Sequence, residues 1–105
     1  MIKIFVDDVR SAPNGFIHFY TVSDTVGFIR RMYKSGNTDF YLSLDHDAGD
    51  YALDYINILK QLEDMRHCGK LNHIKLDVHF HSMNVVGVMN MRAIVNANRD
   101  WMKEV

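Results

Sequence analysis

Three short segments of the sequence hold most of the side chains that could carry out chemistry. They are Asp7-Asp8-Val9-Arg10, Asp45-His46-Asp47 and His79-Phe80-His81-Ser82-Met83-Asn84. Each comes at the end of an apolar run, where a simple turn would need only one Asp or Gly. Carboxylates, imidazoles and hydroxyls bind cations, transfer protons and hold anions. We therefore treat the three segments as candidates for one functional site.

The carboxylates of Asp7, Asp8 and Asp45 form the candidate metal site. Brought close together they would repel one another unless a cation or shared protons offset their charge. Oxygen ligands suit Mg²⁺ or Mn²⁺, which bind one or two carboxylates and keep water or phosphate oxygens as further ligands. Taken alone, Asp7-Asp8 also fits a simple loop or a helix cap.

Proton transfer is the role expected of the acidic and imidazole groups after the third and fourth strands. The predicted catalytic residues are Asp45, His46, Asp47 and His81. An imidazole that titrates near neutral pH can accept or donate a proton in phosphoryl chemistry. His79 shares a strand face with His81 and is either half of a two-histidine metal site or a hydrogen-bonded core histidine. No role is assigned to His18, His67 and His73.

Phosphate binding is expected from Arg10, Ser82 and Asn84. Arg10 offers a planar pair of donors for an anion, although it also fits a solvated surface arginine. Ser82 and Asn84 enter the last predicted helix, whose N-terminus presents unpaired N–H groups to an anion. The same two side chains fit helix capping, which does not exclude a phosphate contact.

Four strands are predicted from short β-branched and aromatic runs, over residues 2–6, 16–22, 40–44 and 74–81. Helices are expected over about 23–36, 50–66 and 86–101, the first with Thr21 and Asp24 in capping spacing. The expected core-facing helical positions are Val22, Val26, Ile29, Tyr33, Ala52, Tyr55, Ile56, Leu59, Leu62, Val88, Met91, Val95 and Met102.

This order of elements predicts an α/β fold. Parallel strands need crossover connections, and these are right-handed in nearly all proteins. We expect a three-layer α/β sandwich, with a small, mostly parallel sheet of about four strands and helices on both faces. In an open parallel sheet, ligands bind at the carboxyl ends of the strands. All three polar segments would meet there in one cleft.

Composition limits the classes of protein that the chain could represent. The 105 residues, 48% of them hydrophobic, predict one globular domain over residues 1–105. A net charge of −1 argues against an extended nucleic-acid surface, although a nucleotide or a short RNA end remains a possible ligand. With Cys68 as the single cysteine, no internal disulfide is expected, which fits the cytoplasm. No signal peptide or membrane span is expected, and the oligomeric state is left open.

The motifs "DDVR", "LDHD" and "HSMN", in this order after three strands, resemble the cyclic-phosphate processing receiver domain family. This family is a divergent relative of the response-regulator receiver, and the resemblance runs from Ile2 to about Arg99. It implies a receiver-like, flavodoxin-type fold shortened by a helix and the fifth strand. It also implies handling of cyclic phosphates, such as 2′,3′-cyclic phosphate RNA ends or cyclic nucleotides.

Comparison with ordinary receivers implies further roles. Asp7-Asp8 matches their acidic metal pair, Asp45 their phosphoacceptor and Ser82 their hydroxyl switch residue. The chain departs from them in showing no fifth strand that ends in lysine, and in having His46-Asp47 after the acceptor position. Added acid–base groups suit hydrolysis or ligand binding better than a phosphorelay, which must preserve its aspartyl phosphate.

The leading hypothesis is a phosphoesterase-like domain that binds or hydrolyses a cyclic phosphate with help from Mg²⁺ or Mn²⁺. Its partner would be a phosphate-containing small molecule or RNA end. One alternative is a signalling receiver phosphorylated on Asp45. Another is a binding protein that sequesters a nucleotide without turnover.

Overall fold

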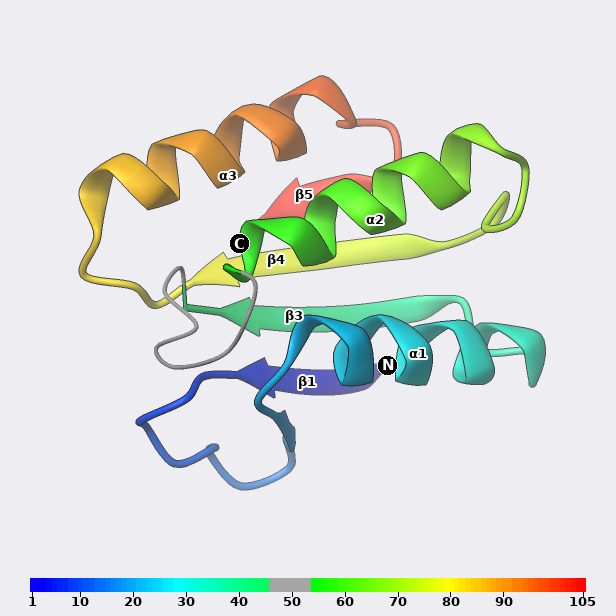
Figure 1. Cartoon of the computed structure of the whole chain (residues 1–105). Coiled ribbons are helices and arrows are strands. Elements are labelled where there is room, and N and C mark those ends of the chain that lie inside the picture. The colour runs from blue at the N-terminus through cyan, green and yellow to red at the C-terminus, as the bar shows by residue number, and fades with distance from the viewer. Residues whose placement is uncertain (46–53) are drawn as a thin grey trace.

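The computed structural model describes residues 1–45 and 54–105. Strands and helices alternate along these residues after an initial pair of strands (Figure 1). The elements are β1 Ile2–Val6, β2 Ile17–Phe19, α1 Val22–Lys34, β3 Asp39–Leu44, α2 Ile56–His67, β4 Lys75–Phe80, α3 Val85–Ala97 and β5 Met102–Glu104.

The strands form one fully parallel sheet in the order β2-β1-β3-β4-β5. Val6 of β1 is in register with Leu44 of β3, which in turn is in register with Phe80 of β4. The three central strands therefore end at the same level. This shared edge places the polar segments that follow them side by side, as the predicted parallel sheet requires. The receiver-like α/β fold is thereby confirmed.

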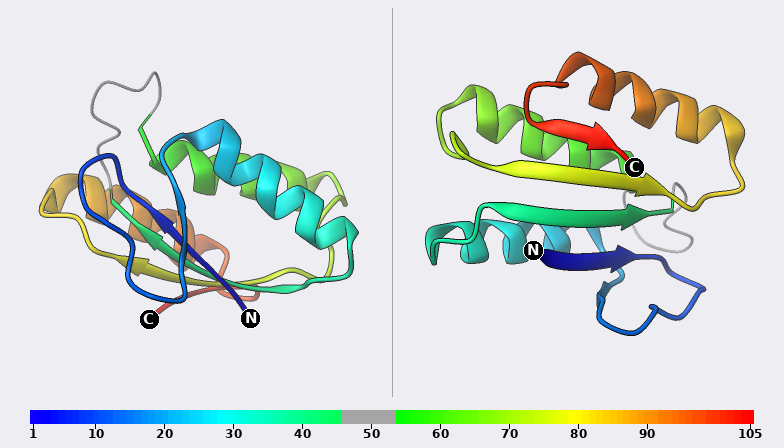
Figure 2. Two further views of the ribbon diagram at one scale, coloured as in Figure 1. Left: turned by 90° about the horizontal axis from the view of Figure 1, so that it is seen from below. Right: turned by 180° about the vertical axis from the view of Figure 1, so that it is seen from behind.

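The helices form a single layer on one face of the sheet. Helix α2 lies between α1 and α3 and contacts both, and the view from behind shows the strands with no helix in front of them (Figure 2). The structure therefore has two layers, one of strands and one of helices, and not the three layers that the sequence predicted (Figure 2). Residues 7–16 join β1 to β2 without a helix, and the later crossovers all run in the same direction across the sheet. Right-handed crossovers in one direction place every helix on the same side.

The core lies between the helices and the side chains of alternate strand residues. Ile4, Leu42 and Val78 are fully buried on this helix-covered face. The opposite face carries the intervening residues, including exposed His79 and half-buried Tyr41. The predicted core-facing helical residues that are buried are Val22, Val26, Ile29, Tyr55, Leu59, Leu62, Met91, Val95 and Met102, whereas Tyr33, Ile56 and Val88 are half-buried. Ala52 lies outside the described residues.

The C-terminal part of the chain differs from the sequence prediction. Helix α3 ends at Ala97, and the chain turns through hydrogen bonds from the N–H groups of Trp101 and Met102 to the carbonyl oxygen of Asn98. Met102–Glu104 then pairs with β4, so the sheet has a fifth strand that the sequence analysis did not predict. Two of its three residues are charged, which hides the usual apolar strand pattern.

The other boundaries agree more closely with the predictions. Strand β2 covers only Ile17–Phe19 of the predicted 16–22, and α1 begins at Val22. The Thr21 hydroxyl accepts a hydrogen bond from the Asp24 N–H over 3.1 Å, which confirms the predicted N-cap. The early part of the predicted second helix falls in residues 46–53, outside the described residues. None of the helices within the described ranges is long and apolar enough to cross a bilayer.

Candidate functional site

Strand register brings Asp7, Asp45 and His81 together at the carboxyl edge of the sheet. Each residue comes directly after a registered residue, namely Val6, Leu44 or Phe80. Their backbones extend the sheet by one step, because Asp45 N–H donates to the Val6 carbonyl and His81 N–H to the Leu44 carbonyl. Three predicted site residues from three segments therefore meet at one place.

Asp7 is the centre of a hydrogen-bond network, with a side chain that is 0% exposed. Its Oδ1 accepts the backbone N–H groups of Val9 at 2.8 Å and Arg10 at 2.9 Å. Its Oδ2 accepts Nη1 of Arg10 at 3.0 Å and Nε2 of His81 at 2.8 Å. A carboxylate has about four acceptor positions, so these four donors satisfy Asp7 completely.

These donors control the ionisation of Asp7. Burial by itself raises the pKa of the Asp7 carboxyl, but the backbone N–H groups of Arg10 and Val9 and the side chains of Arg10 and His81 outweigh it. The result is a pKa of about 2, below the ordinary value of 3.8. Asp7 is therefore ionised at neutral pH, despite being buried.

His81 connects three strands through its side chain. Its ring stacks on Phe5 of β1, with centroids 4.5 Å apart and planes within 5°. Nδ1 lies 2.8 Å from the Ser43 hydroxyl of β3, and Nε2 lies 2.8 Å from Asp7 Oδ2. Because ionised Asp7 can only accept, Nε2 carries the proton. In the neutral ring, Nδ1 is then the acceptor for the Ser43 hydroxyl.

Burial lowers the pKa of His81 below the ordinary 6.5, while the hydrogen bond and charge of Asp7 and the charge of Asp45 act in the opposite direction. The charge of nearby Arg10 lowers it further. His81 is thus mainly neutral at pH 7, with Nε2 protonated and Nδ1 accepting the Ser43 hydroxyl. Such a group can accept a proton, and Asp7 would stabilise the imidazolium that forms.

Arg10 supplies the positive charge at this edge. Nη1 lies 3.0 Å from Asp7 Oδ2 and 3.7 Å from Asp45 Oδ2, while 46% of the side chain is exposed. The hydrogen bond and charge of Asp7 raise the pKa of Arg10, so it stays protonated. A guanidinium has five N–H donors in a planar fork. Arg10 is therefore anchored at one nitrogen and accessible to an anion at the others.

The three predicted metal ligands do form a cluster. One carboxylate oxygen each from Asp7, Asp8 and Asp45 lies within 4.8 Å of the other two, which is compatible with a divalent cation. The donor set is hard oxygen, as Mg²⁺ and Mn²⁺ prefer. Since Asp7 already accepts four N–H groups, it could bind a cation only by giving up one of them. Half-exposed Arg10 is the partner most easily displaced.

Ser82 and Asn84 prepare the start of α3. The Ser82 hydroxyl accepts the Asn84 N–H over 3.1 Å, and Asn84 Oδ1 accepts the Gly87 N–H over 2.8 Å. Asn84 is thus the N-cap of α3, which agrees with the helix-capping interpretation of the sequence. The Ser82 hydroxyl proton stays available as a donor, since its oxygen acts here as the acceptor.

Three residues of the network were not recognised from the sequence: Phe5, Ser43 and His18. Phe5 and Ser43 stand two positions before Asp7 and Asp45, on the same strand faces, so strand alternation could have indicated them. His18 Nε2 donates to the Asp7 carbonyl over 2.8 Å, and the ring stands edge-on to Phe5. Nothing local in the sequence marks His18, because its place depends on the pairing of β1 with β2.

The prediction for His79 and those for His46 and Asp47 have different outcomes. His79 is exposed on the helix-free face and its Nδ1 donates to the Val105 carbonyl over 3.0 Å, so it is hydrogen-bonded but is not a core residue. His46 and Asp47 lie outside the described residues, so their predicted roles stay predictions.

The fifth strand of an ordinary receiver ends in a lysine, whereas β5 of this chain does not. The lysine of β5, Lys103, lies in mid-strand in register with Asp77, and Glu104 and Val105 follow it. Arg10, from the loop after β1, instead places a positive charge near Asp45. A positive charge near Asp45 therefore comes from the loop after β1 and not from β5.

One comparison with known proteins gives a match. The family model of the cyclic-phosphate processing receiver domain matches residues 2–97, which include all three polar segments. No curated protein and no solved structure gives a significant match. Because the matched region covers nearly the whole sequence, the chain belongs to the cyclic-phosphate processing receiver domain family.

Proposed function

We propose that this receiver domain binds a cyclic phosphate, either a 2′,3′-cyclic phosphate RNA end or a cyclic nucleotide, and hydrolyses it. The observation that carries the proposal is the pairing of Arg10 Nη1 and His81 Nε2 on the same oxygen of buried Asp7. One carboxylate thereby holds an anion-binding group beside a proton-transfer group. A phosphodiester hydrolase needs this combination.

Phosphate binding falls to Arg10, Ser82 and Asn84. Arg10 would present its remaining N–H donors to the phosphoryl oxygens while Asp7 fixes its orientation. Ser82 would donate its hydroxyl proton. Asn84 acts through the helix that it caps, because the first N–H groups of α3 lie at the same edge of the sheet.

Proton transfer falls to His81, together with Asp45, His46 and Asp47. Neutral His81 would take up a proton at Nδ1 through the Ser43 hydroxyl, which would pass its own proton to Nδ1 and receive one from the attacking water. The reverse transfer would protonate the leaving ribose oxygen. The negative charge of Asp7 favours the intermediate imidazolium, since its carboxylate contacts Nε2. Ser43 keeps the ring in the orientation that leaves Nδ1 without a proton.

A divalent cation fits the donor set of the site. Asp8 and Asp45 would hold it beside Asp7, whose oxygens stay engaged by Arg10 and His81. When bound, Mg²⁺ or Mn²⁺ supplies Lewis-acid polarisation of a phosphoryl oxygen.

Turnover of a 2′,3′-cyclic nucleotide, followed by ³¹P NMR with Mg²⁺ and by chromatography with paramagnetic Mn²⁺, tests the proposal. We expect conversion to the monoester, loss of activity with EDTA, and a fall of about a hundredfold or more in Asp45→Asn and His81→Ala. Matched controls are Asp100→Asn and His67→Ala, which change exposed residues away from this edge and should leave the rate unchanged. Turnover that is absent in the unaltered protein, or that is insensitive to both site variants, would rule out the enzymatic proposal.

A second candidate function is signalling through phosphorylation of Asp45. It is favoured by the place of Asp45 directly after β3 and beside Asp8, in the family of receivers. Incubation with acetyl phosphate and Mg²⁺ would then add one phosphoryl group of about 80 Da, absent in Asp45→Asn. A stable adduct without nucleotide turnover would favour signalling. Tight nucleotide binding with neither outcome would favour sequestration.

One domain over residues 1–105 and a cytoplasmic location fit the composition and the single cysteine, Cys68. The ligand would be a small phosphate compound or an RNA end, rather than an extended nucleic acid.

A further inference from the structure

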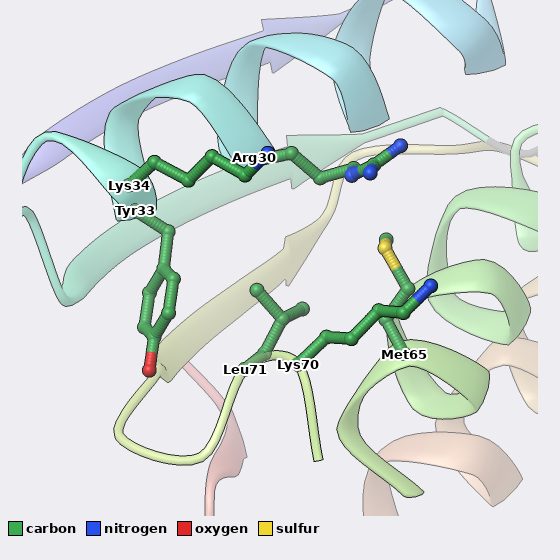
Figure 3. A pocket seen from close by; sticks show the side chains of 6 residues that line it. All are labelled: Arg30, Tyr33, Lys34, Met65, Lys70 and Leu71. Atoms are coloured by element: carbon green, nitrogen blue, oxygen red, sulfur yellow. The ribbon is translucent and has the colours of Figure 1, made fainter. Parts of the chain in front are cut away.

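A cavity lies at the edge of the molecule opposite to the carboxyl-edge network, beside the amino ends of β3 and β4. It has a volume of about 290 Å³ and lies between the C-terminal halves of α1 and α2 (Figure 3). Its lining residues are Arg30, Tyr33, Lys34, Met65, Lys70 and Leu71. None of them belongs to the carboxyl-edge network.

The end of each helix is a Schellman motif, which fixes the walls of the cavity. In α2, Gly69 has a φ of +79°, its N–H donates to the Arg66 carbonyl over 3.1 Å, and the Lys70 N–H donates to the Met65 carbonyl over 2.9 Å. Lys70 is therefore held directly beside Met65, and the chain turns so that Leu71 packs inward. The corresponding bonds at the end of α1 run from Gly36 and Asn37.

The described residues that line the cavity carry three positive charges and no negative charge. Arg30 and Lys34 are one turn apart on α1, and Lys70 faces them from the end of α2 (Figure 3). None of the three forms an ion pair with a carboxylate of residues 1–45 or 54–105. Like charges four residues apart on a helix repel each other, so Arg30 and Lys34 together destabilise α1.

Helix dipoles explain only part of this charge. A basic residue in the last turn compensates the partial negative charge of a helix C-terminus, and Lys34 holds that position in α1. Arg30 lies before the last turn of α1, and Lys70 lies beyond the end of α2. These two cations are therefore in excess of what the helix ends require.

The interior of the cavity is apolar and ordered. Leu71 is only 2% exposed, and Met65 is half-buried against the core. The Tyr33 hydroxyl accepts the His73 N–H over 3.1 Å, which fixes the aromatic ring as a wall. An apolar cavity of about 150 Å³ is enough to take up benzene, so this one has room for an aromatic ring and an attached anion.

We propose that this cavity binds an aromatic phosphate monoester, the ring packing against Tyr33, Met65 and Leu71 and the phosphate facing Arg30, Lys34 and Lys70. A dianionic phosphate matches several monovalent cations better than a single carboxylate does. Nucleoside monophosphates also combine an aromatic ring with a phosphate monoester, with a ribose between the two. The site is separate from the carboxyl-edge site and does not depend on the function proposed there.

Titration of the ¹⁵N-labelled chain with phenyl phosphate tests the proposal by NMR. We expect saturable shifts of the amides around Tyr33 and Leu71, and binding about tenfold or more weaker for inorganic phosphate and for phenol. The double variant Arg30→Gln with Lys70→Gln should bind phenyl phosphate at least about tenfold more weakly than the unaltered protein does. Met65→Trp should block the ring site without changing charge.

Two controls separate this cavity from other anion sites. Lys60→Gln removes one exposed charge of α2 outside the cavity, and Arg10→Gln alters the carboxyl-edge site. Neither should change the shifts at Tyr33 and Leu71. No saturable shift there, equal binding of inorganic phosphate, or full binding in both the charge variant and Met65→Trp would each overturn the proposal.

Discussion

The stability of the fold should depend on pH through Asp7, and Asp7→Asn is the change that isolates this dependence. The native pKa of about 2 lies below the ordinary 3.8. A carboxyl with a lowered native pKa stabilises the protein above its unfolded pKa, and this stabilisation is lost as the pH falls. Each pKa unit corresponds to about 1.4 kcal/mol. The difference between the native and the ordinary pKa of Asp7 therefore stabilises the folded protein by about 2.5 kcal/mol at neutral pH.

The assay is urea unfolding at a series of pH values, followed by fluorescence of Trp101, the single and largely buried tryptophan. The difference in unfolding free energy between the unaltered protein and Asp7→Asn should first widen as the pH falls from neutrality to about 5, because the variant has the lower His81 pKa. It should shrink by about 1 kcal/mol by pH 3 and further towards pH 2. The asparagine variant should be less stable throughout the neutral range, because Arg10 and His81 lose an ionised partner.

The matched control is Asp8→Asn, which neutralises the neighbouring carboxylate outside the Asp7 hydrogen bonds. Its stability difference from the unaltered protein should not shrink in the same way. If the curves of the unaltered protein and Asp7→Asn stay parallel from pH 5 to pH 2.5, Asp7 is not the buried, fully satisfied carboxylate described above.

Three further predictions concern the same edge of the sheet. The His81 ring, followed by NMR, should titrate below 6.5, because burial lowers its pKa, and still lower in Asp7→Asn, which removes the opposing hydrogen bond and charge. The neutral ring therefore stabilises the fold above pH 6.5 and loses this effect as the pH falls; a midpoint that rises in Asp7→Asn would contradict the contact. Ser43→Ala should lower the unfolding free energy by about 1 kcal/mol in urea, through loss of the bond to His81 Nδ1, and no change would argue against that bond. Asn84→Ala should cost about 1 kcal/mol through the lost cap to Gly87, and Asn84→Ser should recover most of it, whereas equal losses in both would exclude capping as the cause.

Much of the fold could be predicted because the central strands are continuous apolar runs. The runs that became β1, β3 and β4 end where charged or polar residues begin, so their positions and parallel pairing followed from simple rules. The layer arrangement did not follow in the same way. It depends on the connection between β1 and β2, which has no helix, so that every crossover runs in one direction. Strand β5 escaped prediction because Lys103 and Glu104 interrupt the apolar pattern.

The candidate site was predictable at the level of segments but not of contacts. Register brings Asp7, Asp45 and His81 together as the sequence implied. The partners of the His81 ring were not evident, because a side chain that reaches across β3 to Phe5 leaves no periodic signal. The contact of Arg10 with Asp7 needs the fold of the loop after β1, which sequence patterns do not specify.

The most direct test of the central claim is the location at which a cyclic nucleotide binds. A titration of the ¹⁵N-labelled chain with 2′,3′-cyclic AMP in EDTA, which prevents the proposed turnover, should give saturable NMR shifts centred on residues 7–10 and 81–84 and on the His81 ring. Arg10→Gln should weaken this binding by about tenfold or more. Absence of saturable shifts, or shifts confined to the amino edge of the sheet around Tyr33 and Leu71, would contradict a cyclic-phosphate site built on Asp7.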